Sequence, residues 1–292
     1  MKKLFGMGGR LLLSAMTLVA TTFFNPALPV ARAADEPVTF TEVARSGIAW
    51  PDYAYRSSAW GGGAWGDYND DGWLDIGLPN HPSLTSSPPE MHDSAIMRNN
   101  GDGTFTNTIY ELGIKLQEDW HDIAWVDYDD DGDQDLWRTA GGRGGQGEGP
   151  NSLSRQEADG TFTEVAADAG VDYGYGRGRG SVWFDYDLDG DLDMYFTGAD
   201  SSSGPVYAPN TMFRNNLQET GQATFTDVGQ LGTSPFIGAN SQVSVADYDM
   251  DGDEDLIVTG YSPGTTLYRN DGGTITNANS SAGIATEGGG QA

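Results

Sequence analysis

The sequence has no cysteine and few basic residues. Its 292 residues include 15 Lys+Arg and three His against 43 Asp+Glu, a formal net charge of −28. Without cysteine, disulfides, thiolate metal sites and cysteine nucleophiles are excluded. A balance this acidic predicts no nucleic-acid partner, because the phosphates would repel the protein. The 42 Gly, 13 Pro and 37% hydrophobic residues instead indicate a loop-rich protein with packed cores.

Residues 1–33 have the pattern of a secretory signal peptide. Positive charges precede the apolar run LLLSAMTLVATTFF, and a small-x-small cleavage site follows at 31–33. The run is shorter than the roughly 20 residues that span a bilayer, and no later segment is apolar enough. We therefore expect a protein that is secreted, either extracellular or at the cell surface, with the periplasm as an alternative. The mature chain, 34–292, is expected to have no membrane span.

The mature chain repeats one acidic string four times. The copies are DYNDDGWLD from Asp67, DYDDDGDQD from Asp127, DYDLDGDLD from Asp185 and DYDMDGDED from Asp247. Apolar residues flank each copy, which predicts a loop between two strands. An R-N-N-like segment and a TFT-like segment follow in each unit and predict a third and a fourth strand. Units with four short strands and Gly-rich turns are typical of β-propeller blades, so we predict an all-β propeller of four-stranded blades over 34–292.

The repeat pattern also predicts how much of a ring the sequence contains. Residues 38–48 (VTFTEVARSGI) match the fourth strand and tail of a repeat, but no first three strands precede them. The last repeat already has its own fourth strand near Ile275. We therefore expect four complete repeats, an orphan strand and an incomplete, truncated ring.

The acidic loops at 67–75, 127–135, 185–193 and 247–255 place oxygen ligands at positions 1, 3, 5 and 9 and Gly at position 6. Such side chains converge when the loop curls, and Ca²⁺ takes six to eight oxygens, usually including the position-7 carbonyl. The glycine supplies a turn that a β-carbon would hinder. We expect about four calcium sites. Their candidate side-chain ligands are Asp67, Asn69, Asp71, Asp75, Asp127, Asp129, Asp131, Asp135, Asp185, Asp187, Asp189, Asp193, Asp247, Asp249, Asp251 and Asp255, and their candidate carbonyl ligands are Trp73, Asp133, Asp191 and Asp253.

The loops differ from EF-hands and from each other. Position 12 is Leu78, Arg138, Phe196 or Val258 instead of Glu, and strands replace the flanking helices. Mg²⁺ is a weaker candidate than Ca²⁺ because its small octahedral shell tolerates crowded carboxylates less well. Asn69 replaces a carboxylate in the first loop, which we expect to bind most weakly.

These motifs resemble a known family. DYDxDGxxDLxV, then LYRNNGDGTFTxV, then a terminal AGV or AGI is similar to the FG-GAP/VCBS repeat, over residues from about 38 to the C-terminus. That repeat forms the calcium-binding propellers of integrin α chains and occurs in many bacterial secreted proteins, including those with an ASPIC/UnbV domain. The resemblance implies the propeller fold and the metal. This sequence departs from it at Asn69, Gln156 and Ile275.

Catalytic signals are sparse. The mature chain has a single lysine, Lys115, and neither G-x-S-x-G nor H-E-x-x-H occurs. The sequence therefore favours a non-enzymatic module for adhesion or for recognition of an extracellular protein or glycan ligand, with structural calcium. A propeller-type polysaccharide lyase and a structural spacer of a larger surface protein stay open as alternatives.

Two further expectations concern surfaces and core. The loops between the second and third strands vary most in length, so we place a binding surface on segments 79–94, 140–151, 199–210 and 260–264. The tryptophans two positions before the first three acidic loops are expected to be core residues stacked between blades. They are Trp65, Trp125 and Trp183.

Overall fold

The computed structural model describes residues 62–79, 94–114, 120–141, 150–172, 177–199, 210–229, 242–260 and 264–284. All of them belong to one compact unit, Val43–Ala292. The predicted signal peptide at 1–33 and the predicted orphan strand at 38–48 lie outside the described residues.

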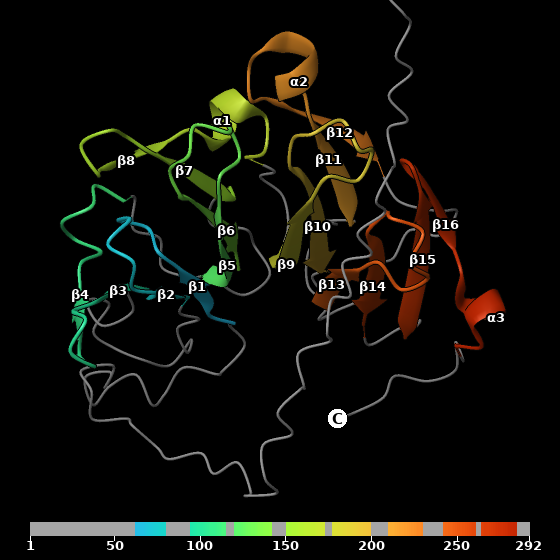
Figure 1. Cartoon of the computed structure of the whole chain (residues 1–292), viewed down its shortest axis with the longest axis horizontal. Helices are drawn as coiled ribbons and strands as arrows, with labels where there is room; N and C mark the ends of the chain where they lie inside the picture. Colours follow the sequence, from blue (N-terminus) through green and yellow to red (C-terminus); the bar gives the residue numbers. More distant parts are fainter. Residues whose placement is uncertain are drawn as a thin grey trace, which may run out of the picture. The chain divides into compact units, whose positions relative to one another are not determined.

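The described residues form four antiparallel sheets of four strands each (Figure 1), which confirms the prediction of an all-β fold built from four-stranded units. Within every sheet the strands are neighbours in chain order. The sheets contain β1 (Ala64–Gly66), β2 (Asp75–Leu78), β3 (Ala95–Asn99) and β4 (Phe105–Asn107); β5 (Trp120–Val126), β6 (Asp135–Ala140), β7 (Ser152–Gln156) and β8 (Phe162–Glu164); β9 (Arg177–Phe184), β10 (Asp193–Ala199), β11 (Thr211–Asn215) and β12 (Phe225–Gly229); and β13 (Gln242–Ala246), β14 (Asp255–Thr259), β15 (Thr265–Asp271) and β16 (Thr274–Asn277). We number the four sheets with their loops as repeats 1 to 4.

Antiparallel order gives each sheet two different edges. In repeat 2, Val126 pairs with Asp135 beside the acidic loop, whereas Arg138 pairs with Ser152 at the other end of β6. The acidic loop and the turn between the third and fourth strands therefore share one edge, which we call the acidic edge. The loop between the second and third strands and the connection to the next sheet share the opposite edge.

Consecutive sheets pack against each other. The first strands β1 and β5, β5 and β9, and β9 and β13 are in contact. Between repeats 2 and 3 the core includes Trp137 and Leu153 from one sheet and Met194 from the other, all completely buried. Burial of each such side chain contributes about 1.5–3 kcal/mol. The sheets approach closely at Gly66, where an added Cβ would lie 2.6 Å from the Trp125 ring.

The tryptophan prediction is only partly correct. Trp125 stacks on Tyr68 of the preceding repeat with ring centroids 5.4 Å apart, and Trp183 meets Trp137 edge-on at 5.9 Å. The expectation of a core position is wrong for Trp65, whose side chain is 61% exposed. The reason is geometric, because these residues pack on the sheet before their own. Within the described residues no sheet precedes β1.

Three single-turn helices interrupt the strands, and the sequence patterns did not indicate them. They are α1 (Ala166–Ala169), α2 (Leu217–Thr220) and α3 (Asn279–Ala282). α1 and α3 follow the fourth strands of their repeats and end at left-handed glycines, Gly170 with φ 81° and Gly283 with φ 70°. The AGV and AGI tails are therefore helix C-caps. α2 lies between β11 and β12 and has no counterpart among the described turns of the other repeats.

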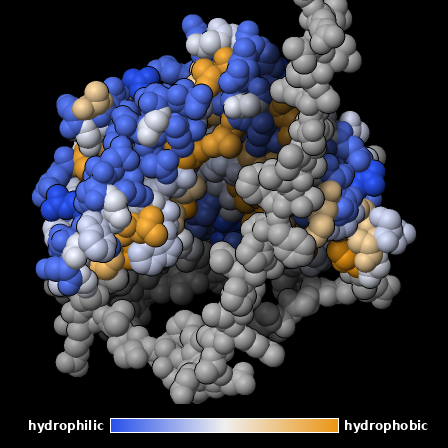
Figure 2. Space-filling model, in the orientation of Figure 1, coloured by the Kyte–Doolittle hydropathy of each residue, from blue (hydrophilic) through white to orange (hydrophobic). Residues whose placement is uncertain are grey.

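The surface of the described residues combines a mainly polar face (Figure 2) with single exposed hydrophobic side chains. Figure 2 shows one face on which hydrophilic side chains predominate. The large exposed hydrophobic side chains come from several repeats, with Met250 at 90% and Trp73 at 52%. Among the described helices, none is long and apolar enough to cross a membrane.

Candidate metal centres

The position-1 aspartates close the acidic loops. In repeat 2, Asp127 Oδ1 accepts from the Asp131 N–H and Oδ2 from the Gly132 N–H, both at 3.1 Å. Asp131 Oδ1 accepts in turn from the Asp133 N–H at 2.9 Å. The other three loops make the same bonds. The position-1 and position-5 carboxylates thus hold the backbone in a curled loop, as the spacing of the acids predicted.

Two backbone positions in every loop are left-handed. The position-6 glycines have φ between 86° and 106°, which confirms the predicted need for glycine. Position 4 was missed, although it has φ between 55° and 62° in all four loops. Asp70 and Asp130 tolerate this region, but Leu188 and Met250 are strained there.

The position-9 aspartates brace each loop against its own sheet. Asp135 is completely buried, and its Oδ2 accepts from the Tyr128 N–H at 3.3 Å while Oδ1 accepts from the Gln156 N–H at 2.8 Å. Asp75, Asp193 and Asp255 make the equivalent two bonds. Each brace joins the acidic loop to the third strand, so it holds the other acids in place.

The loop acids gather into groups that fit a hard cation. One oxygen from each member lies within 4.8 Å of the others in three groups, which are Asp127, Asp129 and Asp135; Asp185, Asp187 and Asp193; and Asp247, Asp249 and Asp251. Two ligands of one Ca²⁺ can be at most about 5 Å apart, twice the usual ligand distance. Asp129 Oδ1 and Asp187 Oδ1 are buried with no hydrogen-bond partner. A buried anionic oxygen is costly unless a cation or donor faces it. The predicted carbonyl ligands stay a prediction.

The pKa values of two position-9 carboxyls lie well above the usual value of aspartate. Burial raises the pKa of Asp135 to about 8, and the charges of Asp129 and Asp131 add to the rise. Burial likewise raises the pKa of Asp193 to about 8, with Asp187 and Asp191 contributing. Backbone N–H donors oppose both shifts without cancelling them.

These shifts predict how stability depends on pH. A carboxyl whose folded pKa lies above its unfolded value of about 4 binds more protons when folded, so stability falls as pH rises from about 4 to about 8. In excess EGTA we expect the urea midpoint to fall between pH 5 and pH 8. In calcium the cation favours the ionised carboxylates, and the fall should disappear. The double variant Asp135→Asn with Asp193→Asn should flatten the curve in EGTA. A midpoint that rises with pH in EGTA would contradict the argument.

The first loop differs from the other three at Asn69. Asn69 Nδ2 donates to Asp71 Oδ2 at 3.1 Å, and Asn69 Oδ1 accepts from the Asp71 N–H at 3.2 Å. The amide thus replaces a charge with internal hydrogen bonds. Within the part of the chain that the structure describes, the loop at 67–75 forms no three-carboxylate group.

We expect the first loop to bind calcium most weakly. Calcium affinity follows the number of charged ligands, so Asn69→Asp should tighten this site by about tenfold. The matched change in the second loop, Asp129→Asn, should weaken that site by a similar factor. Calorimetric titration of both variants would measure the two shifts. The ranking fails if removing the first loop eliminates the tightest site.

Asparagines connect the acidic loops of neighbouring repeats. Asn215 Nδ2 on β11 donates to the carbonyls of Tyr128 in the preceding loop (2.9 Å) and Leu192 in its own loop (3.2 Å). Asn270 Nδ2 on β15 donates to Tyr186 O at 2.7 Å in the same way. Gln156 occupies the equivalent position in repeat 2 and, within the described residues, does not make this bond to Tyr68. The second residue of the R-N-N motif therefore links neighbouring repeats by a hydrogen bond, and we call Asn215 and Asn270 the clasp residues.

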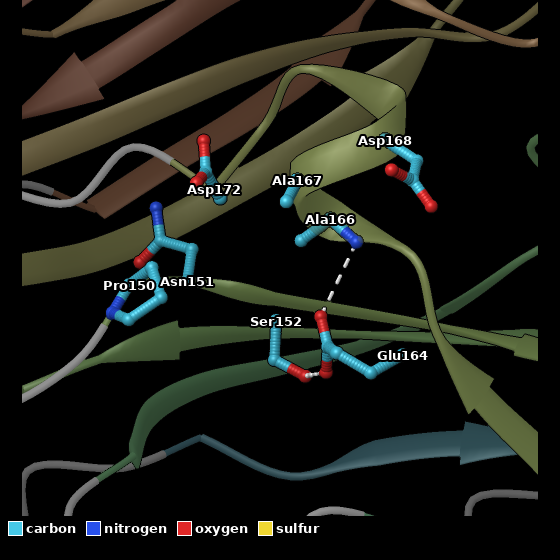
Figure 3. A pocket seen from close by; sticks show the side chains of 8 residues that line it. All are labelled: Pro150, Asn151, Ser152, Glu164, Ala166, Ala167, Asp168 and Asp172. Carbon is cyan, nitrogen blue, oxygen red and sulfur yellow. Dashed lines mark hydrogen bonds between the residues drawn. The ribbon is translucent and has the colours of Figure 1, made fainter.

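A small pocket lies at the opposite edge of repeat 2. It measures about 120 Å³ and is lined by Pro150, Asn151, Ser152, Glu164, Ala166, Ala167, Asp168 and Asp172 (Figure 3). Asn151 is 2% exposed, and its Oδ1 accepts from the Ala140 N–H at 3.0 Å while Nδ2 has no partner. Asn210 of repeat 3 has the same arrangement, with Oδ1 accepting from the Gly198 N–H at 3.0 Å.

A buried cation lies behind this pocket. Arg138 is completely buried, stacks 3.7 Å above the Trp120 ring and donates to Ser154 Oγ at 2.8 Å and to Ser152 Oγ. Ser152 Oγ donates to Glu164 Oε2, and Glu164 Oε1 accepts from the Ala166 N–H at 3.2 Å. The lining of the pocket thus includes the amide of Asn151 and the carboxylates of Glu164, Asp168 and Asp172.

The predicted binding segment 140–151 includes Pro150 and Asn151, whereas the pocket residues from Ser152 to Asp172 lie outside the predicted segments. The P-N-S and P-N-T strings at 150–152 and 209–211 recur at the start of the third strand and could have indicated the pocket. Of the predicted binding segments, residues 80–93, 142–149, 200–209 and 261–263 lie outside the described residues.

The one described histidine has a packing position. His121 is 2% exposed in β5 beside the buried Trp120, and its Nδ1 lies 2.9 Å from Gly178 O. His81 and His92 lie outside the described residues.

Comparisons with known proteins find a similarity among solved structures but none among family models or curated sequences. No family model matches the chain, and no curated protein sequence matches it. Among solved structures, the chain is similar to an Agrocybe aegerita lectin described as specifically recognising non-reducing terminal N-acetylglucosamine. The identity is 18%, the match covers 73% of this chain and 50% of the lectin chain, and the TM-score is 0.38. The chain therefore spans half the length of that lectin.

Proposed function

We propose that this chain is a secreted calcium-binding β-propeller module of the FG-GAP/VCBS type that recognises an extracellular ligand and is not an enzyme. The observation that carries the calcium is the burial of carboxylate oxygens without a donor. Asp129 Oδ1 and Asp187 Oδ1 belong to two acidic groups in the same loop positions. The same uncompensated buried oxygen occurs at position 3 of both loops. A cation bound in each loop would account for it.

The propeller is supported by the way the sheets stack. Each sheet is a four-stranded meander, and consecutive sheets contact each other through their first strands. Radially arranged blades bury both faces in this manner, with the first strand innermost. The calcium sites then lie along the acidic edge, where each holds together a loop and a third strand of one blade. Calcium in this role is structural.

Recognition is assigned to the opposite edge. Asn151, whose buried Nδ2 has no partner, lines the pocket of repeat 2 together with the carboxylates of Asp168 and Asp172. A neutral sugar presents hydroxyls that both donate and accept, so it satisfies such a pocket without burying a new charge. A glycan is therefore the proposed ligand class.

A glycan array probed in calcium and in EGTA tests this function. We expect binding in calcium and loss of binding in EGTA. Asn151→Asp keeps the Oδ acceptor for the Ala140 N–H but removes the Nδ2 donor, so it should abolish binding. Asn210→Asp makes the same change in repeat 3 and is the matched control, which should bind normally.

The alternatives give different results in the same experiments. A folded, calcium-loaded chain that binds no glycan would overturn the recognition role and favour a spacer. Release of unsaturated uronate from acidic polysaccharides would show a lyase instead.

A further inference from the structure

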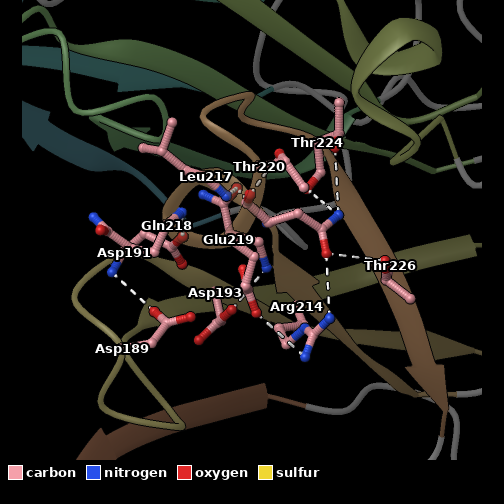
Figure 4. A network of polar contacts seen from close by, with 12 residues as sticks. Asp189, Asp191, Asp193, Arg214, Leu217, Gln218, Glu219, Thr220, Thr224 and Thr226 are labelled. Atoms are coloured by element: carbon pink, nitrogen blue, oxygen red, sulfur yellow. Dashed lines mark hydrogen bonds and ion pairs between the residues drawn. The ribbon is translucent and has the colours of Figure 1, made fainter.

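Repeat 3 has a fourth acidic group that is separate from its position-1, -3 and -9 group. It consists of Asp189 and Asp191 in the acidic loop and Glu219 on α2, with one oxygen of each within 4.8 Å of the others. Figure 4 shows these side chains between the loop and α2, together with Arg214. Glu219 lies 28 residues beyond Asp191 in the chain, so no loop motif includes it.

Asp191 provides an observation independent of the cluster. It is only 4% exposed, and its Oδ2 accepts from the Gln218 N–H at 2.9 Å while its buried Oδ1 has no hydrogen-bond partner. Asp189 is similar, because Oδ1 accepts from the Asp191 N–H at 3.2 Å and the buried Oδ2 has no partner. Two neighbouring carboxylates therefore each leave one buried oxygen uncompensated, which is costly unless a cation or a donor faces it.

The charge near this group is not balanced by the protein. Arg214 Nη1 lies 3.4 Å from Glu219 Oε1 and is the positive side chain paired with the group. Three carboxylates against one guanidinium leave a deficit of two positive charges, which one divalent cation would neutralise. The separations within the group also suit oxygen ligands of one Ca²⁺.

The turn between the third and fourth strands explains why, among the described residues, this group occurs in repeat 3 alone. Its sequence, NNLQETGQATFT, is longer than the NNGDGTFT of repeat 1, and the extra residues form α2. In repeat 4 the equivalent position-7 acid, Asp253, likewise accepts from a backbone N–H of this turn, that of Gly272 at 2.6 Å, but no turn carboxylate joins it among the described residues. The insertion thus brings a third carboxylate to a position-7 side chain.

We propose that Asp189, Asp191 and Glu219 form an additional divalent-cation site in repeat 3. Asp189 bridges this cation and the one held by the loop. The site is additional to the four loop sites of the proposed function, in which Asp191 provides only its carbonyl. It ties the acidic loop to α2 and makes repeat 3 binuclear.

Calcium bound per chain at saturation tests the site, measured by equilibrium dialysis of the whole protein against CaCl₂. We expect Glu219→Gln and Asp191→Asn each to lose one calcium relative to the wild type. Asp191→Asn keeps the acceptor for the Gln218 N–H, so its fold should survive. The matched control is Glu157→Gln, which breaks the Arg155–Glu157 pair (2.9 Å) in the equivalent turn of repeat 2. It should bind as many ions as the wild type.

The outcomes separate this proposal from the loop sites. Unchanged stoichiometry and affinity in Glu219→Gln and Asp191→Asn would overturn the additional site while leaving the loop sites standing. A wild-type chain that binds no calcium would overturn both. Asp189→Asn changes the aspartate shared by both sites of repeat 3, so it should weaken both. Asp251→Asn, the equivalent position-5 change in repeat 4, should weaken only the loop site of that repeat.

Discussion

Removing calcium should lower the melting temperature of this protein by about 10–20 °C. With a dissociation constant of about 0.1 mM and about 1 mM free Ca²⁺, each loop site contributes about 1.4 kcal/mol. Four sites then contribute a free energy comparable to the roughly 5–15 kcal/mol by which whole domains are stable. For a chain of this size, 1 kcal/mol shifts the melting temperature by about 2–4 °C.

The effect should be large because the apo loops are electrostatically unfavourable. The curled backbone holds the acids together even without an ion, through bonds such as those from the Asp131 and Gly132 N–H groups to Asp127. Calorimetric melts in CaCl₂ and in EGTA would measure the shift, with MgCl₂ as the control for general divalent screening. Identical melts in CaCl₂ and EGTA would contradict structural calcium.

The position-9 and position-3 aspartates of a loop should respond differently to alanine substitution when calcium is absent. Asp193→Ala removes the brace and leaves the buried N–H groups of Tyr186 and Asn215 without their acceptor. We expect a loss of about 2–5 kcal/mol in EGTA and a larger loss in calcium, because Asp193 also belongs to the acidic group that would hold the ion. Asp187→Ala removes a carboxylate with a buried, unpartnered oxygen. It should be neutral or stabilising in EGTA and cost about 1.4 kcal/mol only in calcium.

Urea unfolding of both variants, each with and without calcium, would test this contrast. Glu111→Ala is a suitable control, because Glu111 is an exposed acid outside the loops. Equal losses for Asp193→Ala and Asp187→Ala in EGTA would mean that the brace has no separate role.

The strands and loops could be predicted because their signals are local. The same pattern occurs in all four repeats, with alternating β-formers, an acidic string and an R-N-N segment. The four strands of every sheet can therefore be predicted from this repeated sequence pattern. The glycines at position 6 follow from turn chemistry alone. Even the difference of the first loop follows from one letter, Asn69.

What could not be predicted depends on contacts between distant residues. The bond from Asn215 to Tyr128 O joins residues 87 apart, and no local pattern encodes it. Glu219 reaches Asp191 only because α2 folds toward the acidic loop. The exposure of Trp65 depends on which sheet precedes β1, which is a property of stacking and not of the tryptophan. Position 4 was missed because Leu188 and Met250 are not residues that favour a left-handed backbone.

The clasp residues would make the proposed calcium sites interdependent. Asn215 and Asn270 each bond to the tyrosine carbonyl of the loop before their own, so an ordered loop positions the next sheet and that sheet orders the loop. Occupation of one site therefore lowers the free energy of ordering its neighbour, as in a one-dimensional chain with nearest-neighbour coupling. The binding isotherm of repeats 2 to 4 should have a Hill coefficient above one. Within the described residues Gln156 does not make this bond, so the site of repeat 1 should fill independently of its neighbours.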